Sequence, residues 1–578
     1  MDPTEWNRND GFSPGSPILV HVPGLDPKAT RIVPVTDIGR SLDRRAPVVL
    51  VDLVTGRRWP YWAELDSKAR TDGGRLLIIH PAVNLVEGHR YVVALRNMVD
   101  TGGRVLRAPR AFARYLVSGA RDHRAAAMAR ILATARRAGV THRGLYLAWD
   151  FTVASTRNLS ERLLHMRDET FRLLGTKAPR FHVTGVESPP SGPVLRQITG
   201  TVDVPNFLTG KGGPGSVLTN GSGPHDPLPA PHGIRPANFI CVIPRSAMGP
   251  DGMARPSGMG LYGHGLLGSA SEVSAAAPVF SAESNTTFCA TDWIGMSAVD
   301  IPVAVGILRD LGRFRTLPDR LQQSIVDFLV LGRALRTADG FSSHRAFRDG
   351  HGRPFIDRRK LVFVGNSQGG IIGGAASAVA TDWTRVFLGV PGMTYATLLD
   401  RSVDFDAYAA ILDPAYPSRI GQLLGLSLVQ MLWDRGENAG YAAHLSKDPY
   451  PGTPPKTVLL FEAFGDHQVA NVTTEVMART IGAHLRPPAL TGGRSKDRDP
   501  FWAIPRFRRL PATGSALVVW DFGTPAPPAT NEAPRAGEDP HGAGAGEVRV
   551  RRMVAAFLST DGKLEDVCAG RPCATPAS

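Results

Sequence analysis

Short apolar runs separated by turn residues characterise the N-terminal part of the chain. The runs are Ile18–Val22, Val48–Val54, Leu76–His80 and Tyr91–Leu95. Glycine-containing turns such as Asp72-Gly73-Gly74 and Thr101-Gly102-Gly103 lie between or after them. Runs of this length bounded by turn signals are typical of strands. The pattern predicts a small all-β sandwich over residues 1–118.

The periodicity then changes to that of amphipathic helices. A helix is expected before Gly139 and a second from about Leu159 to Leu174, with a strand at Leu145–Val153 between them. Residues 119–180 are therefore predicted to form a helical connector to the rest of the chain.

Strands and helices alternate in the remainder of the chain. Strands are predicted at Phe239–Ile243, Gly258–Tyr262, Thr287–Thr291, Leu361–Val364, Arg385–Val390, Thr457–Ala463 and Ala516–Phe522. Helices are predicted at Ile301–Phe314, Gln322–Thr337, Gly369–Ala380, Val469–His484 and Glu547–Leu558. Unbroken apolar strands need both faces covered, so the pattern favours an α/β fold with a mostly parallel sheet flanked by helices over residues 181–578.

One segment combines a buried strand, a tight turn and a helix of small residues. The strand Leu361–Val364 is followed directly by the sequence Gly-Asn-Ser-Gln-Gly. A serine in this turn takes a strained backbone conformation, so Gly365 and Gly369, two positions away on each side, must lack bulk. The hydroxyl then lies at a helix N-terminus beside the N–H of Gln368. The pattern predicts a nucleophilic Ser367, and a glycine-rich turn in an ordinary sheet is the alternative.

Serine is a poor nucleophile without an oriented base, and in this arrangement the acid and the base follow it in the chain. Asp466 follows the strand Thr457–Ala463 and is the candidate acid, with a helix N-cap as the alternative role. His541, in a loop after the next strand, is the candidate base, with an exposed loop histidine as the alternative. His467 is expected to be a neighbour only, and His484 a helix-face residue.

A second donor for a developing oxyanion is expected at an earlier strand end. The segment Tyr262-Gly-His-Gly-Leu-Leu-Gly follows the strand Gly258–Tyr262. The turn at Gly265 places the N–H of Leu266 as the donor that complements Gln368. His264 is expected to shape this turn, or alternatively to be a satisfied core histidine.

These segments together resemble the α/β-hydrolase superfamily over roughly residues 238–560, and more narrowly secreted bacterial esterases and lipases with an N-terminal β domain. The stretch His80–Leu95, followed by Asp100-Thr-Gly-Gly, resembles the last strands of bacterial Ig-like domains. The resemblance implies an α/β-hydrolase fold behind an Ig-like domain, and a Ser-Asp-His triad that needs no cofactor.

Residues 394–455 form a long insertion between two predicted strands. It contains the apolar helix Ile420–Trp433. Insertions at this place in such hydrolases usually form a cap over the site, and an apolar cap favours hydrophobic acyl substrates and can move as a lid. A helix packed permanently on the core has the same apolar pattern and is the alternative.

Composition and charge narrow the class of protein. The chain has 578 residues, of which 43% are hydrophobic and 20% charged, which excludes a disordered chain. No apolar stretch is long enough for a transmembrane helix. The net charge is +14, yet the arginines are scattered and lack an interleaved set of aromatics, so no nucleic-acid partner is expected.

The cysteines bear on metals and compartment. Cys568 and Cys573 enclose four residues near the C-terminus, and Cys241 and Cys289 are a possible second pair, so both pairs are disulfide candidates. No zinc-type spacing is present, and no metal is expected. Disulfides favour an exported protein. Because Met1 is not followed by a signal peptide, we expect a leader missing from this sequence, with a cytoplasmic protein as the alternative.

The sequence therefore predicts a serine hydrolase that cleaves a small-molecule or lipid-like carboxylic ester through Ser367, Asp466 and His541. A peptidase or amidase and an acyltransferase use the same triad and are alternatives. A non-catalytic binding or surface protein with a hydrolase fold is a further one. The sequence leaves the oligomeric state open.

Overall fold

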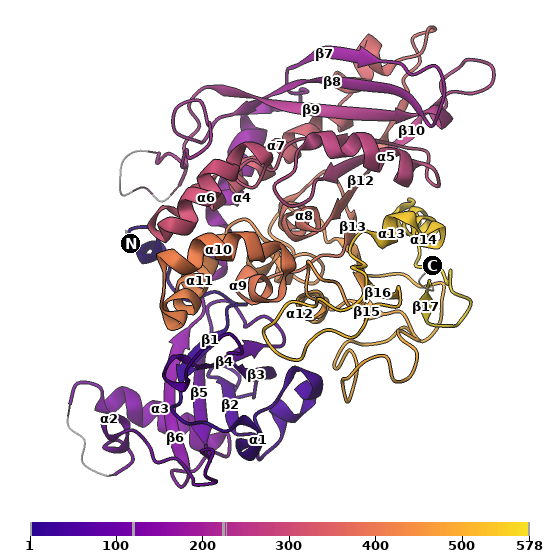
Figure 1. Ribbon diagram of the computed structural model, residues 1–578. Helices are drawn as coiled ribbons and strands as arrows, with labels where there is room; N and C mark the ends of the chain where they lie inside the picture. The colour runs from indigo at the N-terminus through magenta and orange to yellow at the C-terminus, as the bar shows by residue number, and fades with distance from the viewer. Residues whose placement is uncertain (1–2, 118–121, 222–225, 227, 576–578) are drawn as a thin grey trace.

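The computed structural model describes residues 3–117, 122–221, 226 and 228–575. In Figure 1 an N-terminal region with two small sheets lies at one end, a large sheet with helices on both faces fills the other, and insertion helices lie between them. The large sheet comprises eleven strands and each small sheet three, counted over these described residues.

The N-terminal region is a sandwich of two antiparallel sheets. One sheet has the order β1-β4-β3 and the other β2-β5-β6. Their bounds are β1 (Ile18–His21), β2 (Val48–Asp52), β3 (Tyr61–Leu65), β4 (Leu76–Pro81), β5 (Arg90–Arg96) and β6 (Leu145–Thr152). One apolar cluster takes side chains from both sheets, among them Val20, Leu77, Val93 and Tyr146. Two sheets with a common apolar core are thus present, and strand β6 of the second sheet lies beyond the predicted bounds 1–118.

The limits of this region differ from the prediction. The predicted boundary at residue 118 lies outside the described residues. Strand β6 pairs with β5 along most of its length, so the N-terminal region continues into the predicted helical connector. Helix α3 (Ala125–Arg137) covers the outer face of the β2-β5-β6 sheet. The pairing is non-local, and a pattern read along the chain does not show which sheet a strand joins.

The large sheet has the order β15-β16-β14-β13-β12-β10-β11-β9-β8-β7, with β17 beside β16. Strands β7, β8 and β9 are antiparallel to their neighbours, and the remaining pairs are parallel. The bounds are β7 (Phe181–Glu187), β8 (Val194–Pro205), β9 (Ile234–Pro244), β10 (Ser257–Gly263), β11 (Thr286–Ala290), β12 (Ile356–Asn366), β13 (Arg385–Gly389), β14 (Thr457–Ala463), β15 (His484–Leu485), β16 (Ala516–Asp521) and β17 (Cys573–Ala574). The predicted, mostly parallel α/β sheet is thus present, and it begins at β7.

Helices cover both faces of this sheet. Helices α5 (Val273–Ser281) and α14 (Val548–Leu558) pack in one apolar cluster. Helices α4 (Thr156–Leu174), α7 (Thr316–Arg336), α8 (Gln368–Val379) and α12 (Asn471–Ile481) pack in another on the opposite face. The short helices are α1 (Pro27–Thr30), α2 (Arg110–Ala113), α6 (Ile301–Arg309) and α13 (Ala543–Gly546). No described helix is long and apolar enough to cross a membrane.

One predicted helix is shorter than expected. Helix α12 ends at Ile481, because Gly482 takes a left-handed conformation with φ of 69° and terminates it. His484 therefore lies in strand β15, where it pairs with Ala516, and the prediction of a helix-face residue is wrong.

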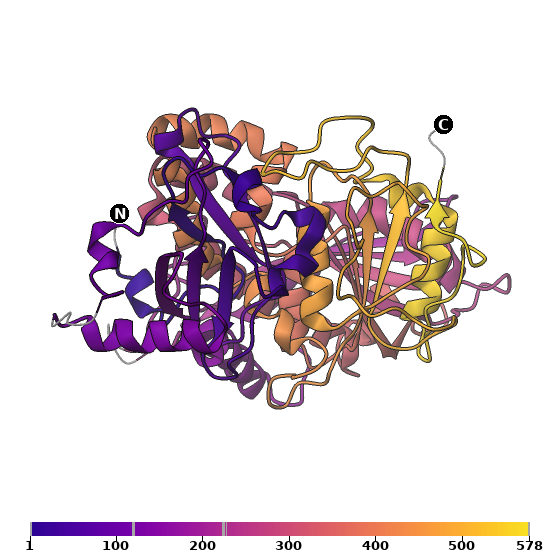
Figure 2. The ribbon, with the colours of Figure 1, turned by 90° about the horizontal axis from the view of Figure 1, so that it is seen from below.

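The insertion contains α9 (Tyr395–Leu398), α10 (Asp406–Ala415) and α11 (Arg419–Trp433). Figure 2 shows these helices beside the N-terminal region. Leu423 of α11 packs against Leu76 and Ile78 of β4. At its N-terminal end the chain contacts the same helix, since Trp6 Nε1 donates to Leu428 O at 2.7 Å. Helix α11 is therefore in contact with the N-terminal region at several points.

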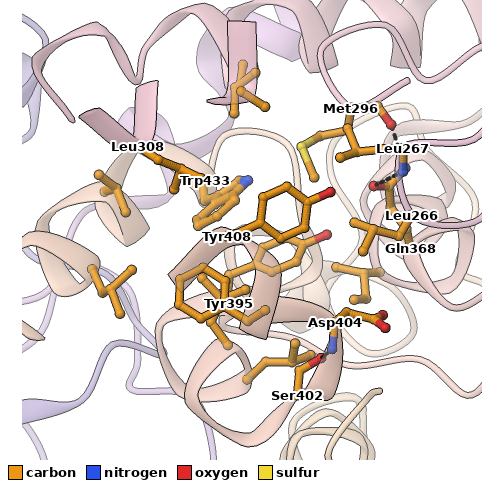
Figure 3. A pocket seen from close by; sticks show the side chains of 18 of the residues that line it. Leu266, Leu267, Met296, Leu308, Gln368, Tyr395, Ser402, Asp404, Tyr408 and Trp433 are labelled. Carbon is orange, nitrogen blue, oxygen red and sulfur yellow. Dashed lines mark hydrogen bonds between the residues drawn. The ribbon is translucent and has the colours of Figure 1, made fainter. Parts of the chain in front are cut away.

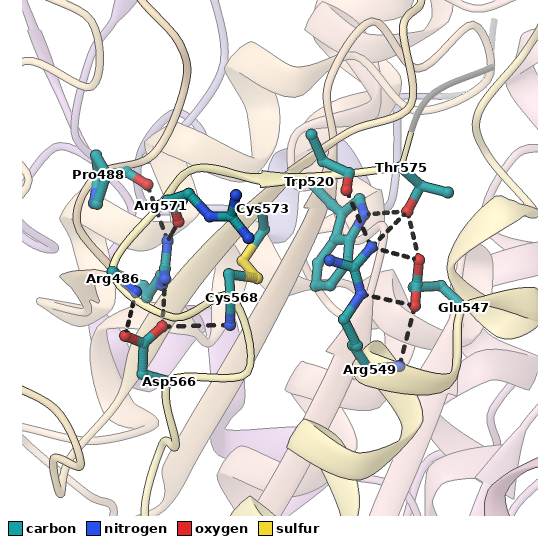
Figure 4. Close-up of a disulfide and its surroundings, with 12 residues drawn as sticks. Arg486, Pro488, Trp520, Glu547, Arg549, Asp566, Cys568, Arg571, Cys573 and Thr575 are labelled. Carbon is teal, nitrogen blue, oxygen red and sulfur yellow. Dashed lines mark hydrogen bonds and ion pairs between the residues drawn. A yellow bond between two sulfur atoms is a disulfide. The ribbon is translucent and has the colours of Figure 1, made fainter.

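Both cysteine pairs are joined. Cys241 of β9 bonds Cys289 of β11, on adjacent strands, and Cys568 bonds Cys573. Figure 4 shows the second disulfide beside the ion pair of Arg486 with Asp566. The tail continues as β17 next to β16, so the disulfide lies in a segment that is itself part of the sheet.

Candidate active site

Ser367 occupies the turn between β12 and α8. It has φ of 56° and ψ of −126°, a conformation that a non-glycine residue rarely adopts. A Cβ on Gly365 would lie 2.2 Å from the carbonyl oxygen of Gly369, and a Cβ on Gly369 would lie 2.0 Å from that of Gly263. Both glycines are therefore required by close backbone approach, which is the physical reason for the motif read from the sequence.

Asp466 and His541 lie in hydrogen-bond contact although 75 residues separate them. Nδ1 of His541 lies 2.8 Å from Oδ2 and 3.0 Å from Oδ1 of Asp466. The carboxylate also accepts from the N–H groups of Gln468 at 2.8 Å and Val469 at 3.0 Å. Asp466 therefore holds its own turn and orients His541. It is not the N-cap of α12, which is Ala470.

Asp539 fixes the loop that carries His541, a role that the sequence analysis missed. Its carboxylate accepts from the N–H of His541 at 3.1 Å and of His467 at 3.2 Å, and from Nε2 of Gln468 at 2.8 Å. The signal was local, since Asp539 lies two residues before His541 and an aspartate commonly accepts from the backbone two residues on. His467 contributes its backbone to this loop, and its ring lines neither of the chambers described below.

Burial disfavours the charged form of His541, but the carboxylates of Asp466, Asp539 and Asp404 outweigh it and raise the pKa of His541 above its ordinary value. Burial and the nearby carboxylates in turn raise the pKa of Asp404. Since Nδ1 donates to Asp466, Nε2 is the nitrogen that remains to accept a proton.

The backbone N–H groups of Leu266 and Gln368 have no acceptor among the described residues. Leu266 lines both chambers that Ser367 lines, and Gln368 follows Ser367 in the chain. The N–H of Gly265 differs, because it donates to Oε2 of Glu272 at 2.8 Å. Gly265, which the sequence analysis assigns to the turn of the oxyanion hole, therefore contributes the turn and not a free donor. Glu272 was missed because it lies seven residues after Gly265, and no local sequence pattern connects the two residues.

The side chain of Gln368 ties the two donor segments together. Nε2 donates to the carbonyl oxygens of Met296 at 2.9 Å and Gly265 at 3.1 Å, and Oε1 accepts from Leu267 N at 3.3 Å. His264 supports the same turn, since Nε2 accepts from Trp293 N at 2.8 Å and Nδ1 lies 2.9 Å from Gly265 O. Burial lowers the pKa of His264, so it is both a satisfied core histidine and a turn-shaping one.

Two chambers meet at Ser367. The wide chamber has a volume of about 600 Å³, and both Ser367 and His541 line it. The apolar chamber, seen in Figure 3, has a volume of about 100 Å³. Its walls come from α6, the insertion, the start of α7 and the turns that contain Leu266 and Met296. They also include Leu308, Tyr395, Tyr408 and Trp433. Ser367 lines this chamber too, and His541 does not.

Solved structures of esterases resemble this chain. Acetyl xylan esterase 1 from Thermoanaerobacterium sp. matches 56% of this chain and 83% of its own, at 14% identity and a TM-score of 0.29. An acetyl xylan esterase from Paenibacillus sp. matches 55% and 84%, at 14% identity and a TM-score of 0.32. A glucuronoyl esterase from Teredinibacter turnerae matches 53% and 67%, at 10% identity and a TM-score of 0.27.

No protein-family model matches the chain, and no curated protein matches it by sequence. No group of three or more histidine, cysteine, aspartate or glutamate side chains suited to a metal ion is found in the part of the chain that the structure describes.

Proposed function

We propose that this chain is a serine hydrolase of the α/β-hydrolase type, with Ser367 as nucleophile, His541 as general base and Asp466 as the residue that orients the base. The observation that carries the proposal is the strained Ser367 turn at a strand end, facing the same chamber as a histidine bonded to a buried carboxylate. The three residues occur in the order nucleophile, acid, base, which is the order of that fold.

In the proposed reaction Nε2 of His541 takes the proton of the Ser367 hydroxyl as Oγ attacks the ester carbonyl carbon. The N–H groups of Leu266 and Gln368 donate to the oxyanion of the tetrahedral intermediate. The intermediate expels the alcohol, which takes the proton from His541, and leaves an acyl group on Ser367. Water, activated by the same histidine, then releases the acid and regenerates the serine.

Carboxylic esters are the proposed substrates because the site offers a nucleophile, a base and two free amides beside an apolar chamber, which suits acyl transfer to water. The insertion 394–455 is proposed to act as the cap of the site, since Tyr395, Tyr408 and Trp433 line the apolar chamber. The two disulfides support the proposal of an exported protein.

The test is labelling by a fluorophosphonate with a methyl substituent, read by intact mass and peptide mapping. We expect one adduct per chain, on Ser367, and none on Ser367→Ala. Ser377→Ala is the matched control, because Ser377 is buried in α8 and bonds Trp383 Nε1 away from the site. An unlabelled wild-type chain, or a label that remains on Ser367→Ala, contradicts the proposal.

A further inference from the structure

We infer that the two chambers divide the substrate: the apolar chamber binds a slender hydrocarbon acyl group, and the wide chamber binds a polar, uncharged alcohol. This inference rests on the proposed function. It assigns each half of the ester to named walls of the site, and so specifies a substrate class.

The position of His541 determines which chamber receives each half of the ester. The alcohol oxygen must accept a proton from Nε2 of His541 as the tetrahedral intermediate collapses, so it has to lie on the side of Ser367 where that histidine is. His541 lines the wide chamber and not the apolar one. The acyl group then points the opposite way, into the apolar chamber. Deacylation fits this direction, since water enters beside His541 once the alcohol has left.

The walls of the apolar chamber determine the chemistry of the acyl group. Beyond its mouth they are aliphatic and aromatic side chains, among them Leu308, Tyr395 and Trp433 (Figure 3). Rings close the space tightly: Trp433 stacks on Tyr395 at 4.3 Å and meets Phe314 edge-on at 4.7 Å. The small volume excludes a bulky branched group. Each methylene of a straight chain that enters should raise kcat/KM about fourfold.

The walls of the wide chamber determine the chemistry of the alcohol. They carry the carboxylates of Asp404 and Glu272 and the amides of Asn366 and Gln468, set among apolar side chains that include Phe280, Phe387 and Phe461. Amides and carboxylates bind hydroxyl groups, whereas two carboxylates repel an anionic alcohol. The positive charge on this wall is Arg551, whose Nη1 donates to the carbonyl oxygens of Ala545 and Gly546 at the end of α13, while its Nε has no partner among the described residues. The two carboxylates of the wall outnumber this one guanidinium.

Asp404 is the residue that distinguishes neutral from anionic alcohols. It comes from the insertion and lies where the two chambers meet, since it lines both. Its N–H donates to Ser402 Oγ at 3.2 Å, which holds the turn (Figure 3). A negative charge at this position lies next to any alcohol that His541 protonates.

The acyl half is tested with p-nitrophenyl esters from acetate to dodecanoate. We expect kcat/KM of the wild type to rise with chain length and then to level off. Leu308→Trp fills the chamber and should lower octanoate hydrolysis at least tenfold relative to acetate. Leu424→Trp is the matched control, because Leu424 is 51% exposed on α11 and lines neither chamber. An octanoate-to-acetate ratio that Leu308→Trp leaves unchanged overturns the assignment.

Folding of the variant is checked with the methyl fluorophosphonate, because its small methyl group does not have to enter the apolar chamber. Leu308→Trp should still be labelled on Ser367. If it is not, Leu308→Phe, a smaller change at the same wall, is compared in the same way, and an unchanged ratio there overturns the assignment as well. Wild-type labelling on Ser367 with no dependence on chain length removes this inference alone, whereas no wild-type labelling removes the proposed function itself.

The alcohol half is tested with two octanoyl esters at pH 8, monooctanoylglycerol and octanoyloxyacetate. They share the acyl group and differ in the charge of the alcohol. The wild type should favour the glycerol ester by at least about tenfold, and Asp404→Asn should reduce this ratio. Asp406→Asn is the control, since that exposed carboxylate bonds Arg535 and lines neither chamber. Equal cleavage of both esters, or a ratio that Asp404→Asn does not change, overturns the assignment.

Discussion

The residues proposed to catalyse the reaction and the residues that line the substrate chambers are fixed in position by different kinds of contact. Ser367, Asp466 and His541 lie on turns at the carboxyl ends of strands of the large sheet or in a loop that returns there, and their neighbours in sequence fix them. The insertion, which contributes walls to the chambers, is in addition tied to the distant N-terminal region by charged side chains.

A buried cluster around Glu64 makes the first of these contacts. Oε1 of Glu64 binds His80 Nε2 at 2.9 Å and also the guanidinium of Arg401 from the insertion. Nδ1 of His80 lies 3.1 Å from Oγ1 of Thr397, also in the insertion. Burial opposes ionisation of Glu64, but Arg401 and His80 outweigh it, and the pKa of Glu64 lies below its ordinary value. The pair is therefore ionic.

A second cluster surrounds Arg419 at the start of α11. Its guanidinium binds Asp66 at 2.8 and 3.0 Å and also binds Asp400. Lys68 Nζ bonds Asp400 at 3.0 Å, and Asn531 Nδ2 bonds Asp66 at 2.7 Å. Two separate ionic clusters thus join the N-terminal region to the insertion. This favours permanent packing of the insertion over a freely moving lid, and it makes the substrate walls dependent on residues far from the nucleophile.

This difference implies that some substitutions should abolish the reaction and that others should alter only the choice of substrate. The largest effect is expected for Ser367→Ala, which removes the nucleophile and should lower kcat for a p-nitrophenyl ester by about 10⁶-fold. Thermal unfolding should change little, because the Ser367 side chain lines both chambers and belongs to neither apolar core cluster of the large sheet. A variant that keeps a tenth of the wild-type rate would remove Ser367 from the mechanism.

Asp466→Asn should lower kcat by about 10⁴-fold while Ser367 stays in place. The amide can donate to Nδ1 of His541 and so favour the tautomer that cannot accept the serine proton. The rate is measured with a p-nitrophenyl ester. Asp521→Asn is the control, since that carboxylate bonds Arg494 outside both chambers, and it should keep kcat near the wild-type value.

Arg401→Met tests the contact between the two regions. Removal of one partner from a buried ion pair leaves Glu64 uncompensated and should cost about 3 kcal/mol of stability. The preference for long acyl chains should fall while Ser367 is still labelled by the methyl fluorophosphonate. Arg359→Met breaks an exposed pair with Asp357 and should leave Tm and chain preference unchanged. Equal effects of the two variants would contradict the comparison.

A smaller effect is expected in the pH profile. His541 must be neutral to act as base, and the carboxylates raise its pKa, so kcat/KM should fall as pH decreases through a value above the ordinary 6.5. Asp404→Asn removes one of these carboxylates and should move the acid limb to lower pH. The profile is recorded with a neutral ester. A shift of the acid limb to higher pH in Asp404→Asn would contradict the expected direction.

The strand and helix pattern predicted most of the large sheet, because its buried strands are nearly continuous apolar runs with helices between them. Strand β14 agrees residue for residue with the prediction at Thr457–Ala463. Strand β3 was missed, since it follows Pro60 directly and carries Glu64 within a short run. The pairing of β6 with β5 was also missed, because strand partners are set by tertiary contacts.

The candidate site divides in the same way. The glycines around Ser367 mark a local steric requirement that can be read from five residues. Glu272 and Asp404 act through carboxylates whose partners depend on how loops fold back, and a single sequence gives no pattern for that. The ionic clusters of Arg401 and Arg419 join residues more than 300 positions apart, so no local pattern could reveal them.

The central claim is that Ser367 carries an acyl group during turnover. Rapid quenching of the enzyme with p-nitrophenyl octanoate, followed by mass mapping, tests it most directly. We expect a p-nitrophenol burst of up to one equivalent and an octanoyl group on the peptide that contains Ser367, both absent in Ser367→Ala. Turnover of the ester by Ser367→Ala at the wild-type rate, or an octanoyl group on another residue, would contradict the account.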